Sequence, residues 1–265
     1  MLRTRLITAA VGLPLVIGAV WIGGALLAAV AAAAVAVACF EIAIAREAQR
    51  APLSIVGALA AGVLPFAALA GEDYLLGGVA GVIALVSTVF ALTKDPRYDL
   101  NDWLWSLAMA LYFGVLAAHF VLLREAGDNE FGRDWLLFAL ITVWVTDTGA
   151  YFVGRPLGRH KMAPAVSPGK TWEGAAGSLI AGFACVFVLN EALDLHLETV
   201  HRVAFGLFLP VVIMFGDLAE SALKRGLGVK DSSGLVPGHG GIADRLDSLL
   251  FAIPSVYWYL KWIVL

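Results

Sequence analysis

Two aspartates interrupt long apolar runs in the second half of the chain. Asp147 lies within the run Trp-Val-Thr-Asp-Thr-Gly-Ala-Tyr, and Asp217 within Val-Val-Ile-Met-Phe-Gly-Asp-Leu-Ala-Glu. A carboxylate at the centre of a membrane helix costs about 2.5–3.5 kcal/mol on insertion scales, so it usually has a partner, a water-filled cavity or a cation. We therefore interpret both residues as candidates for an ion site. Polar packing between helices is the structural alternative.

Asp244 and Asp247 add two more carboxylates at a spacing of three residues, which places them close together on one helical face. Carboxylate oxygens from two helix ends can enclose a hard cation such as Mg²⁺. Capping of a helix N-terminus, where negative charge is favourable, is the alternative for this pair.

A polar loop between two apolar runs contains Ser167, Lys170 and Thr171. Its Gly-Lys-Thr triplet is similar to the end of a P-loop, but that motif needs glycine where Pro164 stands, and a strand before it. Hydroxyls, an ammonium group and backbone N–H groups just before a helix nevertheless suit phosphates. The alternative is a basic membrane anchor followed by a helix cap.

A further polar stretch, 221–248, contains Lys224, Arg225 and Lys230 among glycines and hydroxyls. Basic pairs often mark only the cytoplasmic end of a membrane span. With aspartates on both sides, these residues also suit a metal–polyphosphate complex. His239, between glycines, fits either a pivot of the loop or a ligand or phosphate donor.

Membrane helices must position these residues. The chain of 265 residues is 60% hydrophobic and 15% charged, against about half and a quarter in ordinary soluble domains. The net charge of −3 gives no basic field for nucleic acid. Apolar runs from end to end predict an all-α, polytopic membrane protein with about nine transmembrane helices in a single domain, 1–265. The expected spans are 5–23, 25–45, 53–71, 74–93, 100–123, 134–154, 173–192, 202–223 and 244–264.

The distribution of positive charge predicts the orientation of these spans. With nine spans, the 18 Lys and Arg residues fall on the side of the N-terminus except for Arg124, Arg133, Arg202 and Lys261. By the positive-inside rule the N-terminus is cytoplasmic, and so are the long polar loops. Residues 1–133, with short loops and small side chains, are expected to be scaffold helices, and residues 134–265 to carry the catalytic helices and loops.

These motifs together resemble the signature of the phosphatidate cytidylyltransferases, also called CDP-diacylglycerol synthases. The signature reads S-x-x-K-R, four residues, K-D, then P-x-H-G-G-x-x-D-R-x-D. Its positions here are Ser221, Lys224, Arg225, Lys230, Asp231, Pro237, His239, Gly240, Gly241, Asp244, Arg245 and Asp247. The segments 147–155 and 167–174 also look like the family's D-T-G-A-Y-F-x-G-R and S-P-x-K-T-x-E-G. The resemblance covers roughly residues 140–250.

The resemblance implies a nucleotidyltransferase of phospholipid biosynthesis that transfers a cytidylyl group from CTP to phosphatidate, giving CDP-diacylglycerol and pyrophosphate. It implies Mg²⁺, with room for a second cation such as K⁺, held by Asp217 and Asp244 with Asp247 and Asp147 as helpers. Lys224 and Arg225 would be catalytic with these aspartates. Substrate-binding roles would fall to Ser167, Lys170, Thr171, Ser221, Lys230, Asp231, His239 and Arg245. A homodimer in a bacterial cell membrane, with its active site facing the cytoplasm, is also implied.

Two other functions stay open on the residues alone. A CTP-dependent polyprenol or lipid kinase would share the carboxylates and basic loops, but would transfer the γ-phosphoryl group and release CDP. A secondary transporter would use Asp147 and Asp217 as ion sites, and it needs matching broken helices in two halves. The sequence has no such symmetry.

Overall fold

The computed structural model describes residues 2–46, 51–93, 99–235 and 240–264. The chain divides into two compact units. Unit 1 comprises Met1–Ala126 and Asp231–Leu246, and unit 2 comprises Gly127–Lys230 and Asp247–Leu265. The stretch 231–246, which holds much of the predicted signature, is therefore part of the same unit as the first five helices.

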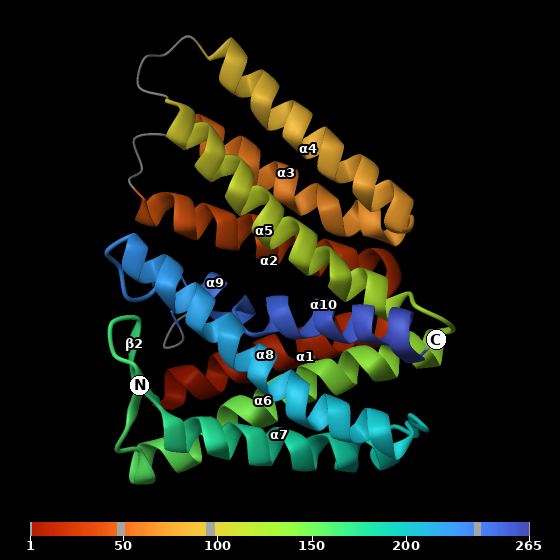
Figure 1. Cartoon of the computed structure of the whole chain (residues 1–265). Helices are drawn as coiled ribbons and strands as arrows, with labels where there is room; N and C mark the ends of the chain where they lie inside the picture. The colour runs from red at the N-terminus through yellow and green to blue at the C-terminus, as the bar shows by residue number, and fades with distance from the viewer. Residues whose placement is uncertain (1, 47–50, 94–98, 236–239, 265) are drawn as a thin grey trace. The chain divides into compact units, whose positions relative to one another are not determined.

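Unit 1 is built from long apolar helices: α1 (Leu2–Ile22), α2 (Gly24–Ala45), α3 (Ala51–Leu69), α4 (Glu72–Leu92) and α5 (Leu100–Arg124). Helices α2, α3, α4 and α5 lie side by side (Figure 1), with α3 in contact with the other three. Small residues line the contacts: a side chain at Gly114 of α5 would collide with Leu64 and Ala61 of α3. Close helix packing through small residues is the usual arrangement in membrane proteins.

A buried arginine and a glutamate fix the turn between α1 and α2. Arg124 is 2% exposed, and its Nε donates to the carbonyl of Val20 at 2.6 Å. The carboxylate of Glu125 accepts from Gly24 N at 2.8 Å. The charges match the helix dipoles, with a cation at the end of α1 and an anion at the start of α2. Gly23, at φ 70°, lies so close to the guanidinium that a side chain there would collide with it.

Unit 2 contains α6 (Asn129–Leu157), α7 (Trp172–Ala192), α8 (Thr199–Gly226), α10 (Leu249–Tyr259) and the π-helical end η2 (Leu260–Val264). Helix α6 packs along α7, α7 packs on α8, and α10 packs on both α8 and α6. Glycines allow the close approach of α6 and α7, because a Cβ at Gly177 would lie 2.9 Å from the carbonyl oxygen of Gly149. The glycine of the Asp-Thr-Gly-Ala-Tyr motif is therefore a packing residue.

A β-hairpin connects α6 and α7, and the sequence did not predict it. Strand β1 (Lys161–Ala163) pairs antiparallel with β2 (Ser167–Thr171), with Lys161 opposite Thr171 and Ala163 opposite Ser167. The sequence analysis predicted only a polar loop here. The hairpin gives its backbone groups hydrogen-bond partners and fixes the residues that precede α7.

The last expected span, 244–264, is broken. A short helix α9 (Ala243–Leu246) belongs to unit 1, and α10 begins only at Leu249, after a turn at residues 247 and 248. Asp244 and Asp247 therefore do not share one continuous helix. Their spacing of three residues therefore does not place the two side chains on one helical face.

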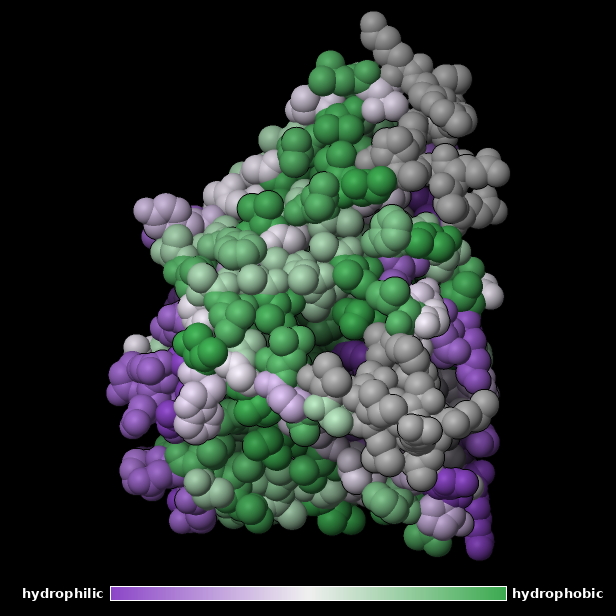
Figure 2. All heavy atoms as spheres, turned by 180° about the vertical axis from the view of Figure 1, so that it is seen from behind, coloured by the Kyte–Doolittle hydropathy of each residue, from purple (hydrophilic) through white to green (hydrophobic). Residues whose placement is uncertain are grey.

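The helices agree with an all-α membrane protein. Among the described residues, six helices (α2, α4, α5, α6, α7 and α8) are long and apolar enough to span a bilayer, and shorter apolar helices cover Gly12–Ile22 and Leu53–Leu69. Large apolar side chains are also exposed, including Leu76 at 69% and Ile180 at 71%. Figure 2 shows apolar residues across the centre of the face it presents. Such a surface is unusual for a soluble protein and suits contact with lipid. The count of nine spans and the cytoplasmic N-terminus stay predictions.

Candidate active site

Three of the predicted site residues come together in unit 2. The Lys170 ammonium, on β2, lies 2.8 Å from Oδ2 of Asp217 on α8, and it also donates to the carbonyl of Met214 at 3.3 Å. One turn further along α8, Ser221 Oγ lies 3.4 Å from Oδ1 of Asp217. The hairpin thus carries a cation to a membrane carboxylate 47 positions further along the chain. We call these three residues the Lys170–Asp217 cluster.

The residues around β2 are held by local hydrogen bonds. Thr171 is buried, and its hydroxyl accepts from Gly174 N at 3.1 Å. Thr171 therefore caps α7, as predicted by the alternative in which the loop ends in a helix cap. Glu173 accepts from the backbone N–H groups of Arg159 and His160 and lies 2.6 Å from His160 Nδ1. These bonds join the end of α6 to the start of α7. Ser167 is half-buried at the start of β2.

Lys224 has a carboxylate partner of its own on α8. Its ammonium lies 2.6 Å from Oε2 of Glu220, and the side chains are 12% and 2% exposed. The sequence analysis gave Glu220 no role. In the folded chain it neutralises a lysine that was expected to bind phosphate.

Arg225 joins the hairpin to the segment that follows α8. Its Nε donates to the carbonyl of Val166 at 3.1 Å, and its Nη1 donates to the carbonyl of Val229 at 3.0 Å. The guanidinium is exposed and bridges two polar loops. This geometry goes beyond that of a simple membrane anchor, because the side chain makes directed bonds to both loops.

Other predicted residues lie on the surface of their units or outside the described chain. Asp147 on α6 and Lys230 after α8 are exposed in unit 2, and Asp231 and Arg245 are exposed in unit 1. His239 lies outside the described residues.

In unit 1, Asp244 is buried at 7% exposure and organises the loop before it. Its Oδ2 accepts from Gly241 N at 2.8 Å, from Ser232 N at 3.1 Å and from Ser232 Oγ at 3.1 Å. The carboxylate therefore bonds to the loop that precedes α9. Asp247 accepts from Ser248 N at 2.7 Å in the turn before α10.

The sequence analysis missed one residue that binds this loop, Glu41. It belongs to α2, within the part expected to be scaffold, yet its carboxylate accepts four hydrogen bonds from residues 232–243. The available signal was a lone acidic residue in an apolar helix, the same signal that drew attention to Asp147 and Asp217. The sequence could not show where its partners lie.

The two signature glycines have separate physical reasons. Gly240 adopts φ 80°, a left-handed conformation that favours glycine. Gly241 is buried, and a side chain there would collide with Ser232 Oγ and the Glu41 carboxylate. The Gly-Gly pair therefore allows the loop to turn and to approach α2 closely.

Asp217 and Asp244, the predicted metal ligands, match a metal site in their oxygen chemistry and in the donors around them. Within the described part of the chain, no three His, Cys, Asp or Glu side chains are grouped as a metal site would require. Asp217 and Asp244 are each oriented by neighbouring donors, as ligating carboxylates usually are. Their oxygen atoms suit Mg²⁺ by chemistry.

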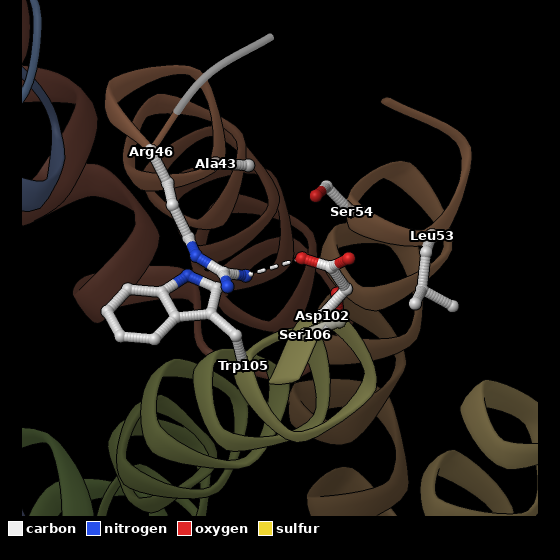
Figure 3. Close-up of a pocket in the computed structure, with 7 residues that line it drawn as sticks. All are labelled: Ala43, Arg46, Leu53, Ser54, Asp102, Trp105 and Ser106. Carbon is white, nitrogen blue, oxygen red and sulfur yellow. Dashed lines mark ion pairs between the residues drawn. The ribbon is translucent and has the colours of Figure 1, made fainter. Parts of the chain in front are cut away.

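A small pocket in unit 1 lies among α2, α3 and α5 (Figure 3). Arg46 lies above the Trp105 ring, 5.0 Å from its centre, and forms an ion pair with Asp102 at 3.2 Å. Leu53, Ser54 and Ser106 complete the lining with Ala43. The cation of this pocket is already neutralised by a buried carboxylate, which makes the pocket a poor match for a triphosphate.

Comparison with known proteins decides the family. A sequence model described as the cytidylyltransferase family matches residues 3–263, almost the whole chain. The chain belongs to the cytidylyltransferase family. The resemblance found in the signature residues is thereby confirmed, and it extends through the first half of the chain.

Individual relatives carry a more specific name. The phosphatidate cytidylyltransferase of Staphylococcus epidermidis is 36% identical over 202 residues, 76% of each chain. That of Bacillus subtilis is 36% identical over 178 residues, which are 67% of this chain and 65% of that protein. That of Haemophilus influenzae is 45% identical over 166 residues, 61% of this chain and 57% of the relative.

Proposed function

We propose that this protein transfers the cytidylyl group of CTP to phosphatidate, with CDP-diacylglycerol and pyrophosphate as products. The observation that carries the proposal is the identity of 36% to a phosphatidate cytidylyltransferase over 76% of both chains. The membrane helices agree with a substrate that resides in a bilayer.

The reaction makes modest demands on acid–base chemistry. An oxygen of the phosphatidate phosphate attacks the α-phosphorus of CTP, a new P–O bond forms, and the bond to the β-phosphate oxygen breaks to release pyrophosphate. A phosphomonoester has a second pKa near 6, so the nucleophile is already largely dianionic at neutral pH. Charge neutralisation and alignment are the main tasks of the protein.

The Lys170–Asp217 cluster is suited to these tasks. Lys170 supplies a cation beside a hydroxyl and a carboxylate, and its side chain is 18% exposed, so anionic oxygens can reach it. Arg225, on α8, bonds to the same hairpin at Val166 and offers a planar fork for phosphate oxygens. We assign phosphate binding to these two cations, with Lys224 and Lys230 in support.

Asp217 and Asp244 stay the predicted ligands of Mg²⁺, with Asp147 and Asp247 as helpers and a second cation such as K⁺ allowed. When bound, the ion would neutralise phosphate oxygens in the transition state. Ser167, Thr171, Ser221, Asp231, His239 and Arg245 stay predicted substrate-binding residues. The homodimer and the cytoplasmic active site are likewise predictions.

The purified protein, incubated with CTP and phosphatidate, tests the proposal. Label at the α-phosphate of CTP should enter the lipid, and unlabelled assays should release pyrophosphate. A parallel reaction with γ-labelled CTP and a polyprenol or diacylglycerol acceptor tests the kinase alternative. Lipid labelled only by γ-labelled CTP, with release of CDP, would overturn the cytidylyltransferase assignment.

A further inference from the structure

Glu41 is a buried charge in a helix that is otherwise apolar. It is the one charged residue among the 22 of α2, and its side chain is 3% exposed. A buried carboxylate without partners is strongly destabilising. Such a residue is tolerated in an apolar helix only where the surrounding structure supplies donors.

The four donors come from the loop that precedes α9 and from the first residue of α9, all in unit 1. Ser233 Oγ and Ile242 N donate to Oε1 of Glu41 at 2.6 and 3.0 Å. Ser232 Oγ and Ala243 N lie 3.1 and 3.0 Å from Oε2. One side chain of α2 thus binds both ends of a segment 191 to 202 positions away in the sequence.

Glu41 is coupled to Asp244 through a shared serine. Ser232 Oγ lies 3.1 Å from Glu41 Oε2 and 3.1 Å from Asp244 Oδ2. A hydroxyl has a single hydrogen to donate, so the two carboxylates compete for it. Loss of the Glu41 carboxylate would therefore change the hydrogen bond that Ser232 Oγ makes to Asp244.

We propose that Glu41 is a positioning residue of the cytidylyltransferase site, acting through Ser232 and the backbone of residues 242–243 to orient Asp244. This inference rests on the proposed function, in which Asp244 is a predicted Mg²⁺ ligand. Residues that orient ligating carboxylates affect metal affinity or activity by about 10- to 100-fold. It also gives α2, in the predicted scaffold, a direct part in organising the signature loop.

Amide hydrogen exchange tests the docking of the loop without reference to activity. In Glu41→Ala the N–H groups of Ile242 and Ala243 lose their acceptor, so a peptide covering 240–246 should exchange at least about tenfold faster than in the wild type. Glu41→Gln, which keeps one carbonyl oxygen, should give an intermediate rate. The hairpin 161–171, in unit 2, serves as the internal reference. Unchanged exchange at 240–246 in Glu41→Ala would overturn the proposal.

Kinetics test whether docking matters for turnover. Glu41→Gln and Ser233→Ala should each lower kcat, the first by about 10- to 100-fold and the second by less, with little change in KM for phosphatidate. The matched control is Asp102→Asn, which alters another buried carboxylate of unit 1, the partner of Arg46. The Asp102→Asn variant should have the same kcat per folded molecule as the wild type. Equal losses in Asp102→Asn and Glu41→Gln would mean general damage to the unit and would overturn the positioning role.

The two readouts separate failure of this inference from failure of the proposed function. If the wild type forms no CDP-diacylglycerol, the function is wrong, while exchange still reports whether Glu41 holds the loop. If the wild type is active and Glu41→Gln retains full kcat despite faster exchange, the function stands and the positioning role is wrong. If Glu41→Ala does not fold, Ser233→Ala decides, because it removes one donor and leaves the buried carboxylate with three.

Discussion

At the scale of single residues, burial distinguishes the two lysine–carboxylate pairs of unit 2. The Lys170–Asp217 pair is 18% and 35% exposed, whereas the Lys224–Glu220 pair is 12% and 2% exposed. Opening a buried pair leaves an uncompensated charge away from water, at a cost of about 3–5 kcal/mol. The more exposed pair opens at lower cost when an anionic substrate arrives. Lys170 is therefore the better candidate for direct contact with phosphate. Lys224 contributes more to the stability of the fold.

Removal of the Lys224 charge should destabilise the protein. In Lys224→Met the buried Glu220 loses its cation, so we expect a loss of about 3–5 kcal/mol in the free energy of unfolding. The double variant Glu220→Gln, Lys224→Met removes both charges and should recover most of that loss. Thermal unfolding in detergent measures both. If the single variant is as stable as the wild type, the pair has no structural role.

Removal of the Asp217 charge should act on turnover. Asp217→Asn keeps the size of the side chain but loses the charge that a hard cation needs, and it leaves Lys170 without its counter-charge. We expect kcat to fall by about 100-fold or more, the scale of losing one electrostatic group from an active site. Asp134→Asn, whose partner is the partly exposed Arg133, is the matched control. A wild-type rate in Asp217→Asn at limiting Mg²⁺ would remove this residue from the ion site.

At the scale of the elements, glycines determine how closely the helices that carry the site approach one another. At Gly177 of α7 an added Cβ would collide with Val153 of α6, whereas at Gly81 of α4 no atom lies within 4 Å. The same substitution should therefore have opposite effects at these two positions. The α6–α7 contact matters for function because the hairpin that carries Lys170 connects these two helices.

Alanine substitutions measure this difference. Gly177→Ala overpacks a close contact and should cost about 1–3 kcal/mol of stability. Gly81→Ala removes a flexible residue from an open helix position and should be neutral or stabilising by up to about 1 kcal/mol. Unfolding curves of the two variants in the same detergent provide the comparison. Equal stability of the two would show that α6 and α7 do not approach as closely as described.

The sequence predicted the elements better than their contacts. Every expected span overlaps an observed helix, because apolar length is a local property. The hairpin at 161–171 and the turn at 247–248 were missed, since both depend on hydrogen bonds and packing that a hydropathy pattern does not record. The partners of Glu41 and Glu220 were missed for a related reason. The partners of Glu41 lie 191 to 202 positions away. Glu220 has the i,i+4 spacing for an ion pair with Lys224, but the sequence analysis gave it no role.

At the scale of the whole molecule, the orientation in the membrane determines which solvent reaches the site. CTP is a charged solute of the cytoplasm, so the hairpin and the signature loop must face that side for the proposed reaction. The positive-inside pattern predicts this orientation from nine spans, with the loop 124–133 outside. Arg124, one of the four basic residues assigned to the outer side, is buried against α1, so it is not an exposed loop charge there.

Single cysteines in a cysteine-free background test the orientation. The two native cysteines to be replaced, Cys39 and Cys185, are both buried. Gly169 and Gly234 are suitable positions on the inner side because a Cβ at either has open space around it, and Glu130 at the start of α6 is exposed on the predicted outer side. An impermeant thiol reagent applied to intact cells should label Glu130→Cys and should reach Gly169→Cys and Gly234→Cys only after the membrane is permeabilised. Labelling of all three from outside would contradict the nine-span topology. Labelling of Gly234→Cys but not Gly169→Cys would place the two polar loops on opposite sides of the membrane, and one active site could not then use both Lys170 and Asp244.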